Sequence, residues 1–392
     1  AVPGVIKVIT HENRERTAWR DKNYQDAVAP PGSPFRPLYD DKVHYSGQPV
    51  ALVLAESFEV ARHAARLVRV HYEAQPHETG LLPHLPRAFE PSRMKYGFSP
   101  PPKPRGDVEA AWAAAAVKHE GTYYSGVEHH NPMELFGCTV VRGEDGHLTV
   151  YDKTQGSQNT RMVLCHAFGL SKSKVTVRNP YVGGAFGSGL RPQYSVILGV
   201  MAALHLQRSA RVVLTRQQMF TFGHRPETWQ QVALAAQPDG QLTAVRHDAV
   251  AETSRFEQYV EVVVNWSGQL YQCDNVKLGY KLVDLDQHTP IVMRAPGAAH
   301  ARRPVRSAPK GEVRAVHARA GAPRRREGRG GPRLPGEHHR RGPGLVGPPG
   351  GRAPLSLPRP QPTTTTKGAR RPSAPTASTR SPATRASPTS IT

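Results

Sequence analysis

The composition of the chain changes abruptly near residue 300, and this change limits how much of the chain can form a folded core. Residues 300–392 contain no Phe, Tyr, Trp, Asp, Asn, Met or Cys, and Arg, Pro, Gly, Ala, Ser and Thr dominate them. Such a segment cannot bury enough apolar surface to offset the entropy that is lost on ordering. The sequence therefore predicts a globular part that ends near residue 297, followed by a disordered basic tail over residues 298–392.

The same tail carries most of the positive charge of the chain. The formal net charge is +21, and residues 300–392 hold 20 Lys and Arg against three acidic residues, which leaves 32 against 28 before them. A basic average favours nucleic-acid binding, but the tail has no aromatic residue for base stacking, so only attraction to phosphates would remain. A basic-tailed nucleic-acid-binding protein is thus one alternative. A frameshift in a GC-rich gene also yields such a composition, and it is the favoured explanation of the tail.

Cysteine usage and hydropathy exclude several classes of protein. The three cysteines, Cys138, Cys165 and Cys273, are widely spaced, so neither an iron–sulfur cluster nor a structural zinc site is indicated. No run of 18 apolar residues exists, so no membrane span is predicted. The chain opens on a strand-like alternation without an initiator Met or a signal peptide. We therefore expect it to begin inside a domain.

The first 75 residues show the pattern of a small α/β domain. Strands are predicted at Val5–Ile9 and within Gly47–Ala55, and Ser57 is a suitable N-cap for a helix over Phe58–Leu67. Val68–Glu73 alternates like a further strand. Residues 76–107 are rich in Pro and polar residues, which predicts a linker.

Residues 108–297 have a mixed α/β pattern. Asp107 is expected to cap a short helix over residues 108–117, and Asn159 to cap a helix over residues 160–168. A hairpin signal stands at Pro238–Gly240. Strands are predicted at residues 137–142, 147–153, 174–178, 211–215, 231–236, 242–251 and 276–283, and an apolar helix at residues 194–206.

The loop Val182–Gly189 holds four glycines in eight residues, between the strand at 174–178 and the helix at 194–206. Glycine reaches positive φ and leaves its N–H groups open, and a helix N-terminus behind the loop favours anionic groups. Phe186 is expected to be an apolar plug. The loop matches neither the phosphate-loop nor the dinucleotide-binding pattern, and a loop that merely turns the chain is the alternative.

Three further segments accompany this loop, at Val127–Glu134, Thr154–Thr160 and Val292–Gly297. At these four segments, in this order and spacing, the chain resembles the large, molybdenum-cofactor subunit of the xanthine dehydrogenase/aldehyde oxidase family, most of all bacterial aldehyde oxidase-type subunits. The resemblance covers about residues 1–297. It implies a hammerhead-type α/β domain over residues 1–75, incomplete at its N-terminus, and an incomplete first molybdenum-cofactor-binding domain over residues 108–297.

The resemblance also assigns roles to residues. Gln155 is expected to donate a hydrogen bond to the apical oxygen on molybdenum, although many glutamines in such turns only cap the chain. Arg294 matches an arginine near the substrate that stabilises developing charge, and its alternative is an ordinary surface arginine. Ser188 replaces a usual second glycine after the family's Gly-Gly-x-Phe-Gly loop. The cofactor-binding candidates are Gln155, Gly183, Gly184, Ala185, Phe186, Gly187 and Ser188.

A group of three residues could form a metal site. His129, His130 and Glu134 suggest a zinc site, but Pro132 interrupts the helix that such spacing needs, so structural packing is expected. In the family the cofactor's dithiolene holds molybdenum, so no metal-ligating side chain is expected.

Leu190 stands near the position where purine-oxidising members carry a carboxylate, and this favours an aldehyde substrate.

The function implied by the resemblance is hydroxylation of an aldehyde or N-heterocycle with oxygen from water. The implied cofactor is molybdenum-molybdopterin, expected in its cytosine dinucleotide form, and electrons would pass to a [2Fe–2S] subunit and an FAD subunit. The family's catalytic glutamate lies late in its sequence, and Glu312, Glu327 and Glu337 do not match that motif. We therefore expect the chain as written to be truncated and inactive, or a non-functional product that aggregates. The expected compartment is the cytoplasm, or the periplasm by co-export with a signal-bearing partner.

Overall fold

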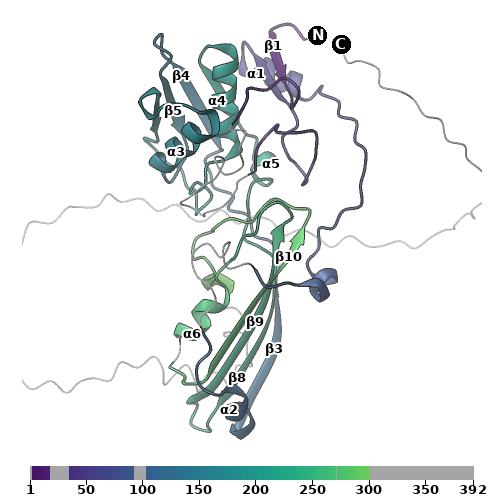
Figure 1. The fold of residues 1–392 in the computed structure, drawn as a ribbon, viewed down its shortest axis with the longest axis vertical. Helices are drawn as coiled ribbons and strands as arrows, with labels where there is room; N and C mark the ends of the chain where they lie inside the picture. The colour runs from purple at the N-terminus through teal and green to yellow at the C-terminus, as the bar shows by residue number, and fades with distance from the viewer. Residues whose placement is uncertain (1, 18–34, 92–102, 271, 301–392) are drawn as a thin grey trace, which may run out of the picture. The chain divides into compact units, whose positions relative to one another are not determined.

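The computed structural model describes residues 2–17, 35–91, 103–270 and 272–300. All of them belong to one structural unit. The predicted tail lies outside the described residues from residue 301 onward. The described residues form helices and three sheets of mixed α/β character (Figure 1), so the predicted fold class is confirmed.

The first sheet has two antiparallel strands, β1 (Val5–Ile9) and β2 (Leu52–Ala55). Helix α1 (Phe58–Ala65) follows, and the Ser57 hydroxyl accepts a hydrogen bond from Val60 N at 3.3 Å, as the cap prediction required. The strand predicted at Val68–Glu73 is wrong. That segment has no regular structure and its side chains are exposed, because alternation alone cannot form a strand where no neighbouring strand pairs with it.

The second sheet has the strand order β6-β5-β4-β7. Strands β4 (Gly137–Arg142) and β5 (Leu148–Asp152) pair antiparallel, as the turn between them predicted. Strand β6 (Val175–Arg178) pairs parallel to β5, and β7 (Ala210–Val213) pairs antiparallel to β4. Because β5 and β6 are parallel, their carboxyl ends lie at the same edge of the sheet. Gln155 follows β5 at this edge, and the glycine-rich loop follows β6.

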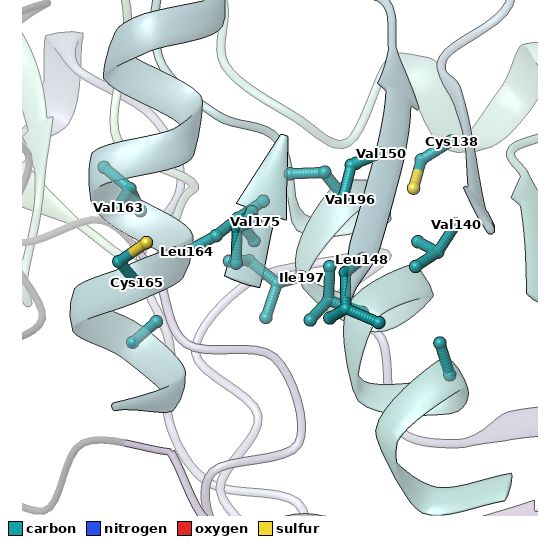
Figure 2. Close-up of a cluster of buried hydrophobic side chains, with 13 residues drawn as sticks. Cys138, Val140, Leu148, Val150, Val163, Leu164, Cys165, Val175, Val196 and Ile197 are labelled. Carbon is teal, nitrogen blue, oxygen red and sulfur yellow. The ribbon is translucent and has the colours of Figure 1, made fainter. Parts of the chain in front are cut away.

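Two helices complete this part of the fold, α3 (Ser157–Phe168) and α4 (Tyr194–Leu206). Figure 2 shows the cluster of apolar side chains that joins them to the strands, with Leu164 from α3 and Val196 from α4. Residues 194–203 of α4 are all buried, which explains the unbroken apolar run of that helix.

The predicted N-terminus of α3 is wrong by three residues, because the helix begins at Ser157 and not at Thr160. Gly156 occupies the N-cap position, so Asn159 lies inside the first turn of the helix. There its side-chain amide donates to the Leu190 carbonyl at 3.3 Å. Gly169 ends the helix in the left-handed conformation, with φ of 66°, as predicted.

The third sheet has the order β10-β9-β8-β3. The predicted hairpin is formed by β8 (Thr228–Ala236) and β9 (Leu242–Ser254), and β10 (Val276–Leu285) pairs parallel to β9. Edge strand β3 (Val117–Ser125) had not been predicted. Asp107 caps α2 (Val108–Ala114) through its carboxylate, which accepts from Ala110 N at 3.0 Å.

Short helices connect these elements. The predicted linker contains the 3-10 helix η2 (Leu82–Arg87), and two further 3-10 helices are η4 (Lys172–Lys174) and η5 (Val264–Trp266). The remaining α-helices are α5 (Arg216–Met219) and α6 (Ser267–Leu270). Over the part of the chain that the structure describes, no helix has both the length and the hydropathy that a membrane crossing needs.

Candidate functional site

Gln155 lies against the glycine-rich loop and fixes its second half. Its side-chain Oε1 accepts hydrogen bonds from Gly187 N at 3.0 Å and from Gly189 N at 3.2 Å. Its backbone N donates to Gly189 O at 2.8 Å. Because two N–H donors meet the side-chain oxygen, the amide can have only one orientation, with its NH2 group turned away from the loop. The Gln155 side chain is exposed, so this NH2 group is available to a ligand.

Glu134 fixes the first half of the loop. Its backbone N donates to Gly183 O at 3.2 Å, and its carboxylate accepts from Gly183 N at 2.6 Å. Lys153 supports this arrangement, because its ammonium donates to Glu134 O at 2.9 Å. Burial lowers the pKa of Lys153 to about 8. The sequence predicts Glu134 only as a packing residue, with a metal ligand as the alternative, and no local signal marks it as a partner of Gly183.

The backbone of the loop explains why glycine is needed there. Gly184 has φ of +88° and Gly187 has φ of +105°, a region that favours glycine. A Cβ atom on Gly187 would lie 2.3 Å from Val292 O. Gly187 therefore allows two segments that are distant in sequence to come into contact.

Phe186 is not the apolar plug that the sequence predicted. Its side chain is 45% exposed, and its own backbone is left-handed, with φ of +57°. This conformation is rare for a residue with a side chain and marks local strain.

The six loop candidates divide into two groups by exposure. Gly183 and Phe186 are exposed and Gly184 is half-buried, so these three can face a ligand. The other three, Ala185, Gly187 and Ser188, are buried. The Ser188 hydroxyl donates to Ala185 O at 2.7 Å, so it stabilises the turn of the loop.

Arg294 is brought next to the loop by its backbone. Its N–H donates to Phe186 O at 2.8 Å, and its carbonyl accepts from the Arg225 guanidinium at 2.6 Å. The Arg294 side chain is exposed, and no hydrogen bond or ion pair of its guanidinium is found among the described residues. The structure therefore places Arg294, Phe186 and Gln155 on one connected set of loops.

His130 closes the contact between the upstream segment and the segment that bears Arg294. Its Nε2 lies 2.9 Å from Val292 O, and burial lowers the pKa of His130 to about 4, so the neutral ring donates this bond. His129 packs its ring against Phe220, with 5.0 Å between ring centroids. Within the residues that the structure describes, no group of three or more His, Cys, Asp and Glu side chains is placed to hold a metal ion.

A buried ion pair holds the far end of the loop. The Arg191 guanidinium donates to both carboxylate oxygens of Glu257, at 2.7 and 2.9 Å, and both side chains are buried. Such a bidentate pair fixes orientation as well as distance. Helix α4 starts only at Tyr194, so this rigid segment, and not the helix N-terminus itself, follows the loop. Sequence reasoning missed this pair because its two members lie in segments that show no common pattern.

The chain is similar in sequence to two protein-family models and to several known proteins. A family model described as the molybdopterin cofactor-binding domain matches residues 92–304, and one described as the aldehyde oxidase and xanthine dehydrogenase a/b hammerhead domain matches residues 1–76. The aldehyde oxidoreductase molybdenum-binding subunit PaoC of Escherichia coli O157:H7 is 30% identical over 298 residues, which cover 76% of this chain and 38% of that protein. The carbon monoxide dehydrogenase large chain of Hydrogenophaga pseudoflava is 28% identical over 295 residues, covering 70% and 36%.

Solved structures show the same relationship. The aldehyde oxidoreductase from Desulfovibrio gigas superposes with a TM-score of 0.64 at 25% identity, covering 76% of this chain and 34% of that one. Quinoline 2-oxidoreductase from Pseudomonas putida 86 has the same fold, with a TM-score of 0.60 at 21% identity, covering 76% and 39%. The chain thus spans less than two fifths of the length of each of these four proteins. It belongs to the aldehyde oxidase and xanthine dehydrogenase family and contains that family's molybdopterin cofactor-binding domain.

Proposed function

We propose that the exposed edge of the glycine-rich loop, together with the Gln155 amide, binds the molybdopterin cofactor of a molybdenum hydroxylase large subunit. One observation carries this proposal. The side-chain oxygen of Gln155 is occupied by Gly187 N and Gly189 N, so the NH2 group is held outward as a donor. A donor that is fixed in advance stabilises negative charge on an oxygen ligand without reorganisation when that charge appears.

The sequence suggested that the N–H groups of the glycines would be open, but those of Gly183, Gly187 and Gly189 are occupied by Glu134 and Gln155. The donor offered to a ligand is therefore the Gln155 amide. Phe186 adds an exposed apolar ring. When bound, the cofactor supplies the two-electron oxidation and the water-derived oxygen of the hydroxylation. The Arg294 side chain is exposed and its backbone N–H is anchored to Phe186 O, and its guanidinium would stabilise charge that develops on the substrate.

We propose an aldehyde as the substrate, with an N-heterocycle as the alternative. Leu190 supports this choice because an apolar side chain cannot hydrogen-bond the polar ring of a purine. The proton acceptor of the reaction is neither Glu134 nor Glu257. The first accepts a hydrogen bond from Gly183 N and the second pairs with Arg191, so both carboxylates are committed to holding the loop.

The same proposal extends to partners and compartment. Electrons would leave through a [2Fe–2S] subunit and an FAD subunit, in keeping with relatives that are named as a molybdenum-binding subunit and a large chain. We propose the cytosine dinucleotide form of the cofactor. The cytoplasm is the proposed compartment, with co-export to the periplasm as the alternative.

The test is cofactor content. The full chain and its Gln155→Glu variant would be produced in a host that makes molybdenum cofactor, and molybdenum and pterin would be measured per chain. The carboxylate keeps both hydrogen bonds to the loop but replaces the outward donor with a negative charge. Gln158→Glu is the matched control, because Gln158 is also exposed and lies three residues away. Metal in the wild type and the control but not in Gln155→Glu is expected, whereas equal metal in all three would overturn the role of the amide.

A further inference from the structure

The segment Met293–Gly297, which carries Arg294, has its backbone polar groups occupied on several sides. Besides the bonds of Arg294 N and O described above, Pro296 O accepts from the indole N–H of Trp266 at 2.8 Å. Gly297 N donates to the carboxylate of Glu261. We call Met293–Gly297 the arginine loop. Its shape is set by contacts with Phe186, with Arg225 and with the stretch that holds Glu261 and Trp266, so Arg294 does not lie on a free loop.

Glu261 is the only carboxylate among the described residues that is bonded to the arginine loop, and it is fully buried. Its second oxygen accepts from the Tyr259 hydroxyl at 2.6 Å, and its backbone N donates to the Tyr280 hydroxyl at 3.1 Å. Tyr280 belongs to β10, so Glu261 is tied to the third sheet. A buried carboxylate is costly to desolvate, and such a group persists only when its oxygens are satisfied.

The contact between Glu261 and the arginine loop is close. Gly297 has φ of +68°, and a Cβ atom there would lie 2.2 Å from Val262 O. Ala295, two residues earlier, also has a left-handed backbone, with φ of +59°. Glycine adopts this backbone readily, but a residue with a side chain such as Ala295 rarely does, so the left-handed conformation at Ala295 points to contacts that hold the loop.

We propose that Glu261 is a positioning residue for Arg294, acting through the backbone N–H of Gly297. The third sheet holds Glu261, Glu261 holds Gly297, and the loop that is fixed in this way keeps the backbone of Arg294 beside Phe186. The role given to Arg294 rests on the function proposed above. The anchoring itself is independent of any cofactor.

The experiment is amide hydrogen exchange of the full chain, followed by mass spectrometry for peptides that cover residues 293–299. Glu261→Met keeps the volume of the side chain but removes both acceptors, and it is expected to raise exchange in these peptides at least tenfold. Glu261→Gln keeps an acceptor oxygen for Gly297 N and is expected to stay within about twofold of the wild type.

Glu227→Met is the matched control. Glu227 is also buried, and its carboxylate also accepts from a tyrosine hydroxyl, that of Tyr124 at 2.6 Å, and from one backbone N–H, that of Leu81 at 3.3 Å. It makes no hydrogen bond to the arginine loop, so its loss should leave residues 293–299 protected. Exchange in Glu261→Met that equals the wild type, or an equal rise in Glu227→Met, would overturn the proposal.

Two further results separate the possible failures. If Glu261→Met does not fold, amide exchange of the folded wild type tests the anchor instead. The proposal requires the Gly297 amide to exchange as slowly as the amides of strands β9 and β10. An amide that exchanges as fast as an exposed loop would refute the anchor. Molybdenum content tests the proposed function separately: a wild type that binds no metal but shows the expected exchange pattern would leave the anchor standing and remove the role of Arg294.

Discussion

The side-chain oxygen of Gln155 lies 3.0 Å from Gly187 N and accepts its hydrogen bond. This contact joins the end of β5 to a loop that follows β6, and the parallel pairing of the two strands makes it possible. The glycine supplies a backbone without a side chain in the way, and the glutamine supplies the acceptor. The outward direction of the amide NH2 group is therefore a property of the backbone around Gly187, and not of a ligand.

Removal of the Gln155 side chain should loosen the loop without unfolding the chain. In Gln155→Ala, the buried N–H groups of Gly187 and Gly189 lose their acceptor, and a cost of about 1–3 kcal/mol is expected. Hydrogen exchange at Gly187 and Gly189 should rise several-fold, as peptide-level mass spectrometry would detect. Gln158→Ala should change neither, and an unaltered loop in Gln155→Ala would contradict the contact.

Gly187→Ala should be far more damaging than an alanine at another left-handed glycine. Gly169, at the end of α3, has φ of +66° with nothing within 4 Å of an added Cβ, so Gly169→Ala should cost about 1 kcal/mol of backbone strain. At Gly187 the added atom also meets Val292 O, and a loss of about 3 kcal/mol or more is expected. Urea unfolding of the two variants gives the difference, and equal losses would show that the close approach is absent.

Breaking the Arg191–Glu257 pair should destabilise the fold strongly. Glu257→Gln leaves a buried guanidinium without its countercharge, which is expected to cost about 3–5 kcal/mol. The exposed pair Lys277–Glu109, with 3.5 Å between its charged atoms, is the comparison. Glu109→Gln should cost less than about 1 kcal/mol in the same urea titration. A small loss in Glu257→Gln would mean that the pair is hydrated in solution.

The stability of the chain should fall between neutral pH and pH 5, in part because of His247. This fully buried ring contacts Ser267 and Gln230, and burial lowers its pKa to about 4. The unfolded chain binds a proton near pH 6.5, whereas the folded chain resists it until about pH 4. Stability is thus present above pH 6.5 and is lost as the pH falls towards 4, by about 2 kcal/mol at pH 5.

The variant His247→Gln isolates this contribution from groups that act in the opposite direction. Burial raises the pKa of Asp152 to about 7, so that carboxyl favours the folded state at low pH and loses this contribution as the pH rises. The loss of stability between pH 7 and pH 5 should shrink in His247→Gln but not in the exposed control His63→Gln. An unchanged loss in both variants would remove His247 as a cause.

The sequence predicted those elements whose apolar pattern matches the way they are buried. The helix at 194–206 and the strand at 137–142 have the predicted bounds, because one is buried on all sides and the other has apolar side chains on the face towards the core. Strand β3 was missed because it lies at a sheet edge and most of its side chains are exposed or half-buried. The strand predicted at Val68–Glu73 is wrong for the opposite reason. Its apolar and polar residues alternate well, but no neighbouring strand pairs with it.

The candidate site was predictable only where a local motif marks it. The glycine-rich loop and Gln155 stand out as motifs, and the structure brings them together, although their roles toward a cofactor stay predictions. The carboxylates that hold this site carry no mark of that role: Glu134 stood out only as a possible zinc ligand, and Glu257 and Glu261, which bond Arg191 and Gly297, did not stand out at all. Each is defined by a contact with a segment far away in the sequence, and the pairing of strands across sheets determines which segments meet.

The close approach of Gly187 to Val292 also sets an order of events during synthesis. The loop at 182–189 leaves the ribosome well before the segment that closes on it. At about 5–20 residues per second, the roughly 100 residues between them take on the order of ten seconds to make. During that interval the glycine-rich loop lacks the contact of Gly187 with Val292 and the hydrogen bond from Arg294 N to Phe186 O. The final shape of the glycine-rich loop can therefore form only after the third sheet has been translated, because its contacts with residues 292–294 come from beyond that sheet.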